Sequence, residues 1–168
     1  MNLSIKEIDD ENERSSPQGY FNVADSYWAS ARVLIGKKLD ASHQENVIRF
    51  LLYHAIECFL KAYLRSKGIS IHDLAHPKKY GHKINRLSSK SIEFGLHIDD
   101  EDKEVFKLMS TGDTVIRSRY FMRGSFYWPD VNALDRTCFS LSDSVGLSLK
   151  SDGIPVRVID RRSMQSSG

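Results

Sequence analysis

The sequence has few of the features that usually identify a protein. It contains two cysteines in 168 residues, and no Cys-x-x-Cys motif that would indicate a zinc or redox site. No window approaches the roughly 18 consecutive apolar residues of a membrane span. The N-terminus is acidic and polar, whereas a secretory signal begins with basic and then apolar residues. We therefore expect a cytoplasmic protein without a membrane partner, with reduced thiols at Cys58 and Cys138.

Charge and motifs are equally unspecific. The 24 basic and 22 acidic residues leave a net charge of +2, so nucleic-acid binding would have to depend on a local cluster. A glycine-rich phosphate loop and a Gly-x-Ser-x-Gly nucleophile elbow are both missing. The 40% hydrophobic and 27% charged fractions are ordinary for one globular domain of this length.

Helical periodicity is the strongest pattern. Apolar residues recur three or four apart over about 22–36, 42–67, 99–122 and 130–150, and a shorter helix is expected at about 83–94. In the second segment, apolar pairs recur every four residues, which predicts the wide buried face of a central helix ending before Gly68. The sequence predicts an all-α fold, an up-and-down bundle of four to five helices with a long loop between the second and third helices.

We expect three parts along the chain. Residues 1–19 carry charge, Ser, Pro and Gly and are predicted to be a mobile arm. Residues 20–150 form the helical bundle. Residues 151–168 are predicted to be a loosely ordered tail that contains one β-like run, from Val156 to Ile159.

Two of the predicted helices carry polar residues beside their apolar faces. Glu57 and Lys61 are one turn apart on the central helix and would form an ion pair on a solvated edge. If the late helix continues to Met122, a rotation of about 100° per residue turns Arg119 and Arg123 toward the core. A guanidinium there requires a carboxylate, so we expect a structural ion pair between Glu57 and Arg119.

The histidines offer only weak candidates for catalysis, namely His82 and His54. A metal site built from His72, His76, His82 and Asp73 would have its ligands strung along a loop without a helical frame. We therefore expect no metal and no cofactor. His54, on the central helix, is expected to be a hydrogen-bonded structural residue.

Three segments resemble the HEPN family, small all-α domains of prokaryotes and higher eukaryotes. AIECFLKAYLRSKG (55–68) is similar to the family's Ala-x-Glu-x-x-Leu-Lys-Ala-x-Leu central helix. GHKINRL (81–87) is similar to its Gly-His-Asp-Leu segment, and RSRYF (117–121) to its Arg-Tyr-Pro stretch. Lys83 replaces the acid of the second motif and Phe121 the proline of the third. The order and separation of the segments fit a domain over about 20–150.

Many HEPN ribonucleases use an Arg-x4-6-His motif on a late helix, usually across a dimer. Here no histidine follows the late arginines. Arg49/His54 and Arg65/His72 match the spacing by chance, because the first pair lies early in the central helix and the second crosses the break at Gly68. The resemblance therefore implies a homodimeric module without this chemistry, which binds nucleotide, RNA or a nucleotidyltransferase-type partner, as in a prokaryotic toxin–antitoxin or defence system.

The residues expected to bind nucleotide or RNA are basic or aromatic. They would form a basic concavity that favours phosphate, near Lys78, Lys79 and Tyr80 of the loop. They are Lys61, His82, Arg117, Arg119, Tyr120 and Arg123.

Two alternatives stay open. One is a metal-independent ribonuclease with an unconventional site, built from His82 or His54 and the late arginines. The other is a helical protein–protein interaction module whose aromatic segment SFYW (125–128) docks a partner.

Overall fold

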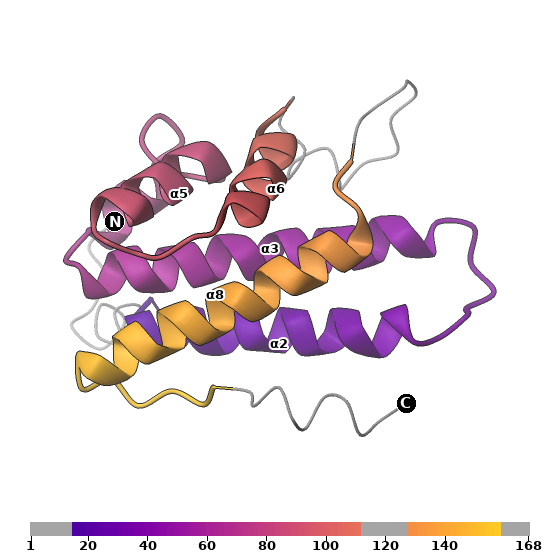
Figure 1. The fold of residues 1–168 in the computed structure, drawn as a ribbon, viewed down its shortest axis with the longest axis horizontal. Coiled ribbons are helices and arrows are strands. Elements are labelled where there is room, and N and C mark those ends of the chain that lie inside the picture. Colours follow the sequence, from indigo (N-terminus) through magenta and orange to yellow (C-terminus); the bar gives the residue numbers. More distant parts are fainter. Residues whose placement is uncertain (1–14, 112–127, 159–168) are drawn as a thin grey trace, which may run out of the picture.

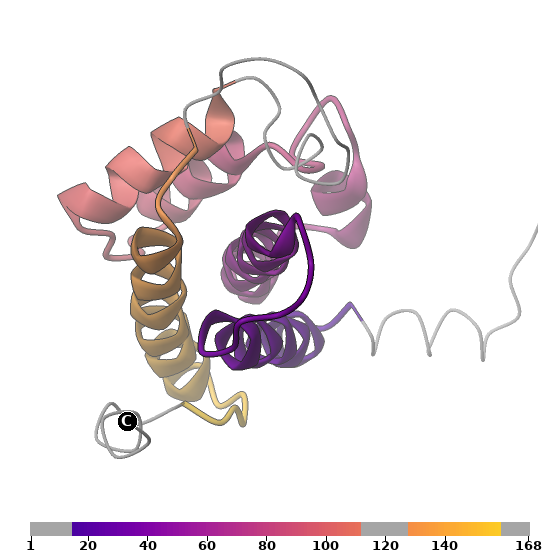
Figure 2. The same ribbon diagram turned by 90° about the vertical axis from the view of Figure 1, so that its right-hand side faces the viewer.

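The computed structural model describes residues 15–111 and 128–158. Within these ranges the chain forms six α-helices and no strand, which confirms the all-α prediction. The long helices α2 (Pro17–Ile35), α3 (Gln44–Ser66) and α8 (Val131–Ser151) pack side by side (Figure 1). The shorter helices α4 (Ile71–Ala75), α5 (Ile84–Glu93) and α6 (Asp100–Ser110) follow α3 in the chain. Figure 2, viewed from one end of the long helices, shows α3 surrounded by the others.

Helix α3 is the centre of the bundle because it packs against α2, α8 and α5. Its apolar pairs supply much of the core, and Leu52, Ile56 and Phe59 are fully buried. The Phe59 ring meets Phe21 of α2 edge to face, with 5.2 Å between ring centroids. The central role predicted for this segment is therefore observed.

The first helix begins at Pro17 rather than at Asn22, so residues 17–19 belong to the bundle and not to an arm. The Ser16 hydroxyl accepts a hydrogen bond from the Gly19 amide, and Pro17 occupies the first helical position. Both are strong start signals. Residues 1–14 lie outside the described part of the chain.

The long loop between the second and third predicted helices contains a further short helix, α4. Its N-cap, Ser70, accepts a hydrogen bond from the Asp73 amide. Five residues are too few to show helical periodicity in a sequence. Only Leu74 of this helix is buried, and it anchors the loop to the core.

Helix α6 ends at Ser110, so the prediction of one helix from 99 to 122 is wrong. Thr111 takes an extended backbone conformation (φ −70°, ψ 101°), and its hydroxyl donates to the Leu108 carbonyl at 2.6 Å. A side chain thereby satisfies one of the free carbonyls at the helix end. The projection that turned Arg119 and Arg123 inward does not apply, because it required an uninterrupted helix.

An ion-pair cluster holds α6 against α8. Asp102 is 1% exposed and accepts hydrogen bonds from Arg136 at 3.0 Å and from Thr137 at 2.7 Å. Asp99, the N-cap of α6, accepts a further bond from Arg136 at 3.2 Å. The carboxylate of Asp102 thus satisfies a buried hydroxyl and a guanidinium together.

The part of the tail from 154 to 158 is held against the bundle and forms no strand. The Gln18 side chain on α2 donates to the Pro155 carbonyl at 2.7 Å, and Ile154 and Val156 pack against the core. The β-like run predicted from Val156 therefore forms no strand over 156–158. Residues 159–168 lie outside the described ranges.

Replacing Asp102 with Ala should lower the free energy of unfolding by about 2–4 kcal/mol, because it leaves the buried Thr137 hydroxyl without its acceptor and removes the most buried of the carboxylates around Arg136. Asp100→Ala is the matched control, since Asp100 is also in the first turn of α6 but its side chain is 96% exposed. Urea unfolding followed by circular dichroism measures both. Equal losses in the two variants would contradict a special role for Asp102.

Candidate functional site

Glu57 and Lys61 form a buried ion pair on α3. The Lys61 ammonium lies 2.7 Å from Oε1 of Glu57, and the two residues are 7% and 2% exposed. The expected solvated polar edge is therefore wrong, because the turning apolar face of α3 carries both residues beneath its neighbours. A buried carboxylate needs more than one partner to offset its loss of hydration.

His82 supplies the second partner, from the chain between α4 and α5. Its Nδ1 lies 2.9 Å from Oε1 and 3.0 Å from Oε2 of Glu57, while its side chain is 45% exposed. A carboxylate only accepts hydrogen bonds, so Nδ1 carries a proton. In the neutral imidazole, Nε2 at the far edge of the ring is then a hydrogen-bond acceptor. Glu57 thus fixes both the orientation and the tautomer of a half-exposed histidine.

Its hydrogen-bond and charge partners keep Glu57 ionised although it is buried. Burial by itself raises the pKa of Glu57, but the hydrogen bond with His82 and the charge of Lys61 outweigh it, and the net pKa is lowered. Burial and the nearby Glu57 charge raise the pKa of the adjacent Cys58 thiol to about 12. Cys58 is consequently a thiol at neutral pH and not a nucleophile. Cys58 and Cys138 are both free.

Arg65, one turn beyond Lys61, lacks a carboxylate partner among the described residues. Its Nη1 reaches only the Ile69 carbonyl, at 3.5 Å, and its Nε is buried without an acceptor. Tyr20 of α2 lies within electrostatic range of both cations; burial raises its pKa and Lys61 partly offsets this. This end of α3 therefore presents a guanidinium whose donors are largely unused.

A basic cleft lies beside the same region, between the α4–α5 connection and α5. Its volume is about 560 Å³, and four cations line it together with Tyr80, Ser89, Asp73 and Glu93. Lys79 pairs with Asp73 at 2.5 Å and Lys90 with Glu93 at 2.6 Å. Arg86 instead donates to the carbonyls of Lys78 and Lys79. Four cations against two carboxylates leave the lining with a charge of +2.

The residues predicted to bind nucleotide or RNA thus lie in different places. Lys61 and His82 meet at Glu57, whereas Lys78, Lys79 and Tyr80 line the basic cleft. Arg117, Arg119, Tyr120 and Arg123 lie outside the described residues, so their roles and the Glu57–Arg119 pair stay predictions.

The other singled-out residues have structural surroundings. His54 packs between Tyr27 and Phe50, with ring centroids 5.0 and 4.9 Å away. Trp128, the described member of the SFYW segment, is half-buried and stacks on Tyr53. Over 15–111 and 128–158, no three His, Cys, Asp or Glu residues are grouped so as to hold a metal.

Arg65 and Arg86 were not among the binding residues predicted from the sequence. Arg65 appeared there only in a chance match to the Arg-x4-6-His spacing. Nothing in the local sequence distinguishes an arginine with a carboxylate partner from one without. That distinction depends on which acids the fold brings near.

No family model, no curated protein and no solved structure matches the chain. In the described part of the chain, no helix has the length and apolar character needed to cross a membrane.

Glu57→Gln should lower the free energy of unfolding by about 2–4 kcal/mol at pH 7, because it leaves Lys61 buried without a counter-charge. The lowered pKa of Glu57 sets the pH dependence. Its stabilising contribution is complete above the ordinary value of 4.5 and is lost as the pH falls through the folded-state pKa. Urea unfolding between pH 3 and 8 should show the wild-type advantage shrinking only at the acidic end.

Glu45→Gln is the matched control, because Glu45 pairs with Arg49 on the same helix but its side chain is 72% exposed. Its effect should stay below about 1 kcal/mol. A wild-type advantage over Glu57→Gln that does not change with pH would contradict an ionised Glu57 in the folded state.

Proposed function

We propose that the chain is a HEPN-like helical module that binds a phosphate-bearing ligand, a nucleotide or an RNA, without reacting with it. One observation carries the proposal. Glu57 and Lys61 come from the first segment that resembles the family, and His82 comes from the second. These three residues form one hydrogen-bonded network. Residues that are 25 positions apart in the sequence thus meet at a single site.

The ligand class is supported by the cations that lack a carboxylate. Arg65 and Arg86 each keep guanidinium donors free, and paired donors of this kind suit phosphate oxygens. Tyr80 in the basic cleft offers an aromatic face for a base. Lys61 donates to Glu57, so it holds the network in place and does not contact the ligand directly.

The partner and assembly parts of the proposal depend on the resemblance alone. They are a homodimer, a nucleotidyltransferase-type partner, and a place in a prokaryotic toxin–antitoxin or defence system. Arg119 and Arg123 remain proposed ligand contacts from the late segment.

Arg65→Gln and Arg86→Gln should each weaken binding of fluorescently labelled single-stranded RNA or of ATP by about fivefold or more at low salt. Each should also reduce the slope of log affinity against log salt by about one. Arg119→Ala and Arg123→Ala should weaken binding too. Fluorescence anisotropy for RNA and calorimetry for ATP measure these changes.

Lys38→Gln is the control, since Lys38 is exposed at the opposite end of α3 and the same charge is removed. Binding that falls equally in all the variants would indicate a response to net charge only. Binding unchanged in all four arginine variants would remove the proposed site.

One observation favours a second function, metal-independent RNA cleavage. A buried carboxylate holds Nδ1–H of His82, so Nε2 of a half-exposed ring can accept a proton. This arrangement suits a general base, with cations nearby to stabilise a phosphate.

If the second function holds, pure protein in EDTA should cleave labelled RNA. His82→Ala should abolish the activity, and His54→Ala should leave it intact. Denaturing gels of several RNA substrates measure the products. RNA that stays intact after incubation with folded wild-type protein would contradict the cleavage function, and ligand binding would remain as the proposed function.

A further inference from the structure

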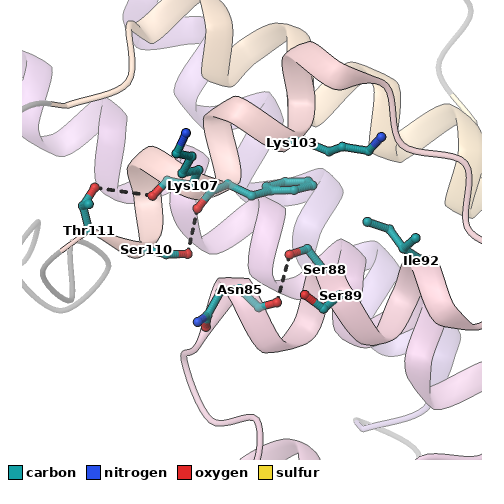
Figure 3. Close-up of a pocket in the computed structure, with 9 residues that line it drawn as sticks. Asn85, Ser88, Ser89, Ile92, Lys103, Lys107, Ser110 and Thr111 are labelled. Carbon is teal, nitrogen blue, oxygen red and sulfur yellow. Dashed lines mark hydrogen bonds between the residues drawn. The ribbon is translucent and has the colours of Figure 1, made fainter.

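A second pocket lies between α5 and α6, apart from the Glu57 network (Figure 3). Its volume is about 370 Å³, at the lower end of the range for small-molecule sites. It shares only Ser89 with the basic cleft. The residues that line it are Asn85, Ser88, Ser89, Ile92, Lys103, Phe106, Lys107, Ser110 and Thr111.

The walls of this pocket are mainly apolar. Phe106 of α6 is 3% exposed and so forms a fixed wall, whereas Ile92 of α5 is 42% exposed. Figure 3 shows Ser88 of α5 and Ser110 of α6 on opposite sides of the gap between the two helices. Such a lining accommodates an apolar ligand that carries a few polar groups.

Three hydroxyl groups of the pocket, those of Ser88, Ser110 and Thr111, present acceptors to a ligand. Ser88 donates to the Asn85 carbonyl at 3.2 Å, Ser110 to the Phe106 carbonyl at 2.7 Å, and Thr111 to the Leu108 carbonyl. A hydroxyl has one proton and two lone pairs. Because these three protons are used within their own helices, these three groups offer a ligand their oxygen lone pairs.

Each of the two lysines that line the pocket is paired with an acid of α6. Lys103 pairs with Asp100 at 2.8 Å, and Lys107 contacts Glu104 at 3.5 Å. In the basic cleft on the other side of Ser89, by contrast, Lys78 and Arg86 have no carboxylate partner among the described residues. The α5–α6 pocket therefore attracts an anion less strongly than the basic cleft does.

From these features we infer that the α5–α6 pocket binds small, uncharged aromatic molecules that carry an N–H or O–H donor. The ring packs against Phe106 and Ile92, and the donor bonds to a serine or threonine oxygen. The inference is independent of phosphate binding, since no residue that holds His82 or Arg65 takes part.

Indole and N-methylindole test the donor requirement, because methylation removes the N–H and leaves the ring system. In ¹H–¹⁵N correlation spectra of the full chain, indole should shift the amide resonances of Ser88, Ser89, Ile92 and Ser110. N-methylindole should bind at least about fivefold more weakly, from the loss of one hydrogen bond. Shifts confined to other residues, no shifts, or equal affinity for both molecules would overturn the inference.

Two substitutions test the location. Ser89→Trp should fill the pocket and abolish the indole shifts, whereas Ser30→Trp, at an exposed serine of α2, should leave them unchanged. Ser110→Ala should lower the preference for indole over N-methylindole, a ratio that a merely structural role would not alter. Indole binding that persists in folded Ser89→Trp, or an unchanged ratio in Ser110→Ala together with Ser88→Ala, would refute the assignment.

Discussion

The buried carboxylate of Glu57 is the constraint on which the rest of the site depends. An ionised carboxylate inside a helical bundle requires partners, and α3 itself supplies only Lys61. The remaining hydrogen-bonding capacity is satisfied by His82, which fixes the end of the α4–α5 connection on α3. Since that connection also forms one wall of the basic cleft, a charge in the core determines the shape of a surface.

The small net charge conceals an uneven distribution. Most described acids are paired with basic residues, as Asp102 is with Arg136 and Glu45 with Arg49. Cations without a carboxylate occur at the α3 end near Arg65 and around Arg86. A protein with almost no net charge can therefore present a local attraction for phosphate. On the other side of α5 both lysines of the pocket are paired with acids, so two neighbouring pockets favour ligands of different chemistry.

The sequence predicts best what depends on neighbouring residues along a helix. The four-residue repeat of apolar pairs correctly placed α3, and the Glu57–Lys61 spacing correctly suggested an ion pair. The burial of that pair, its contact with His82 and the unpaired state of Arg65 depend on segments that meet only in the folded chain. The end of α6 was missed because the apolar residues keep their helical spacing beyond Ser110 in the sequence, whereas the backbone leaves the helix at Thr111.

The order in which Glu57 meets its partners affects how the protein folds. Lys61 is one turn away on the same helix, so the ion pair can form while α3 is still in water. The core then closes over a neutral pair, and no bare carboxylate is dehydrated on the way to the native state. His82 joins only after the chain between α3 and α5 has closed, a slower step that brings together residues distant in sequence. The local partner is beside the charge before it is buried, and the distant partner completes the site.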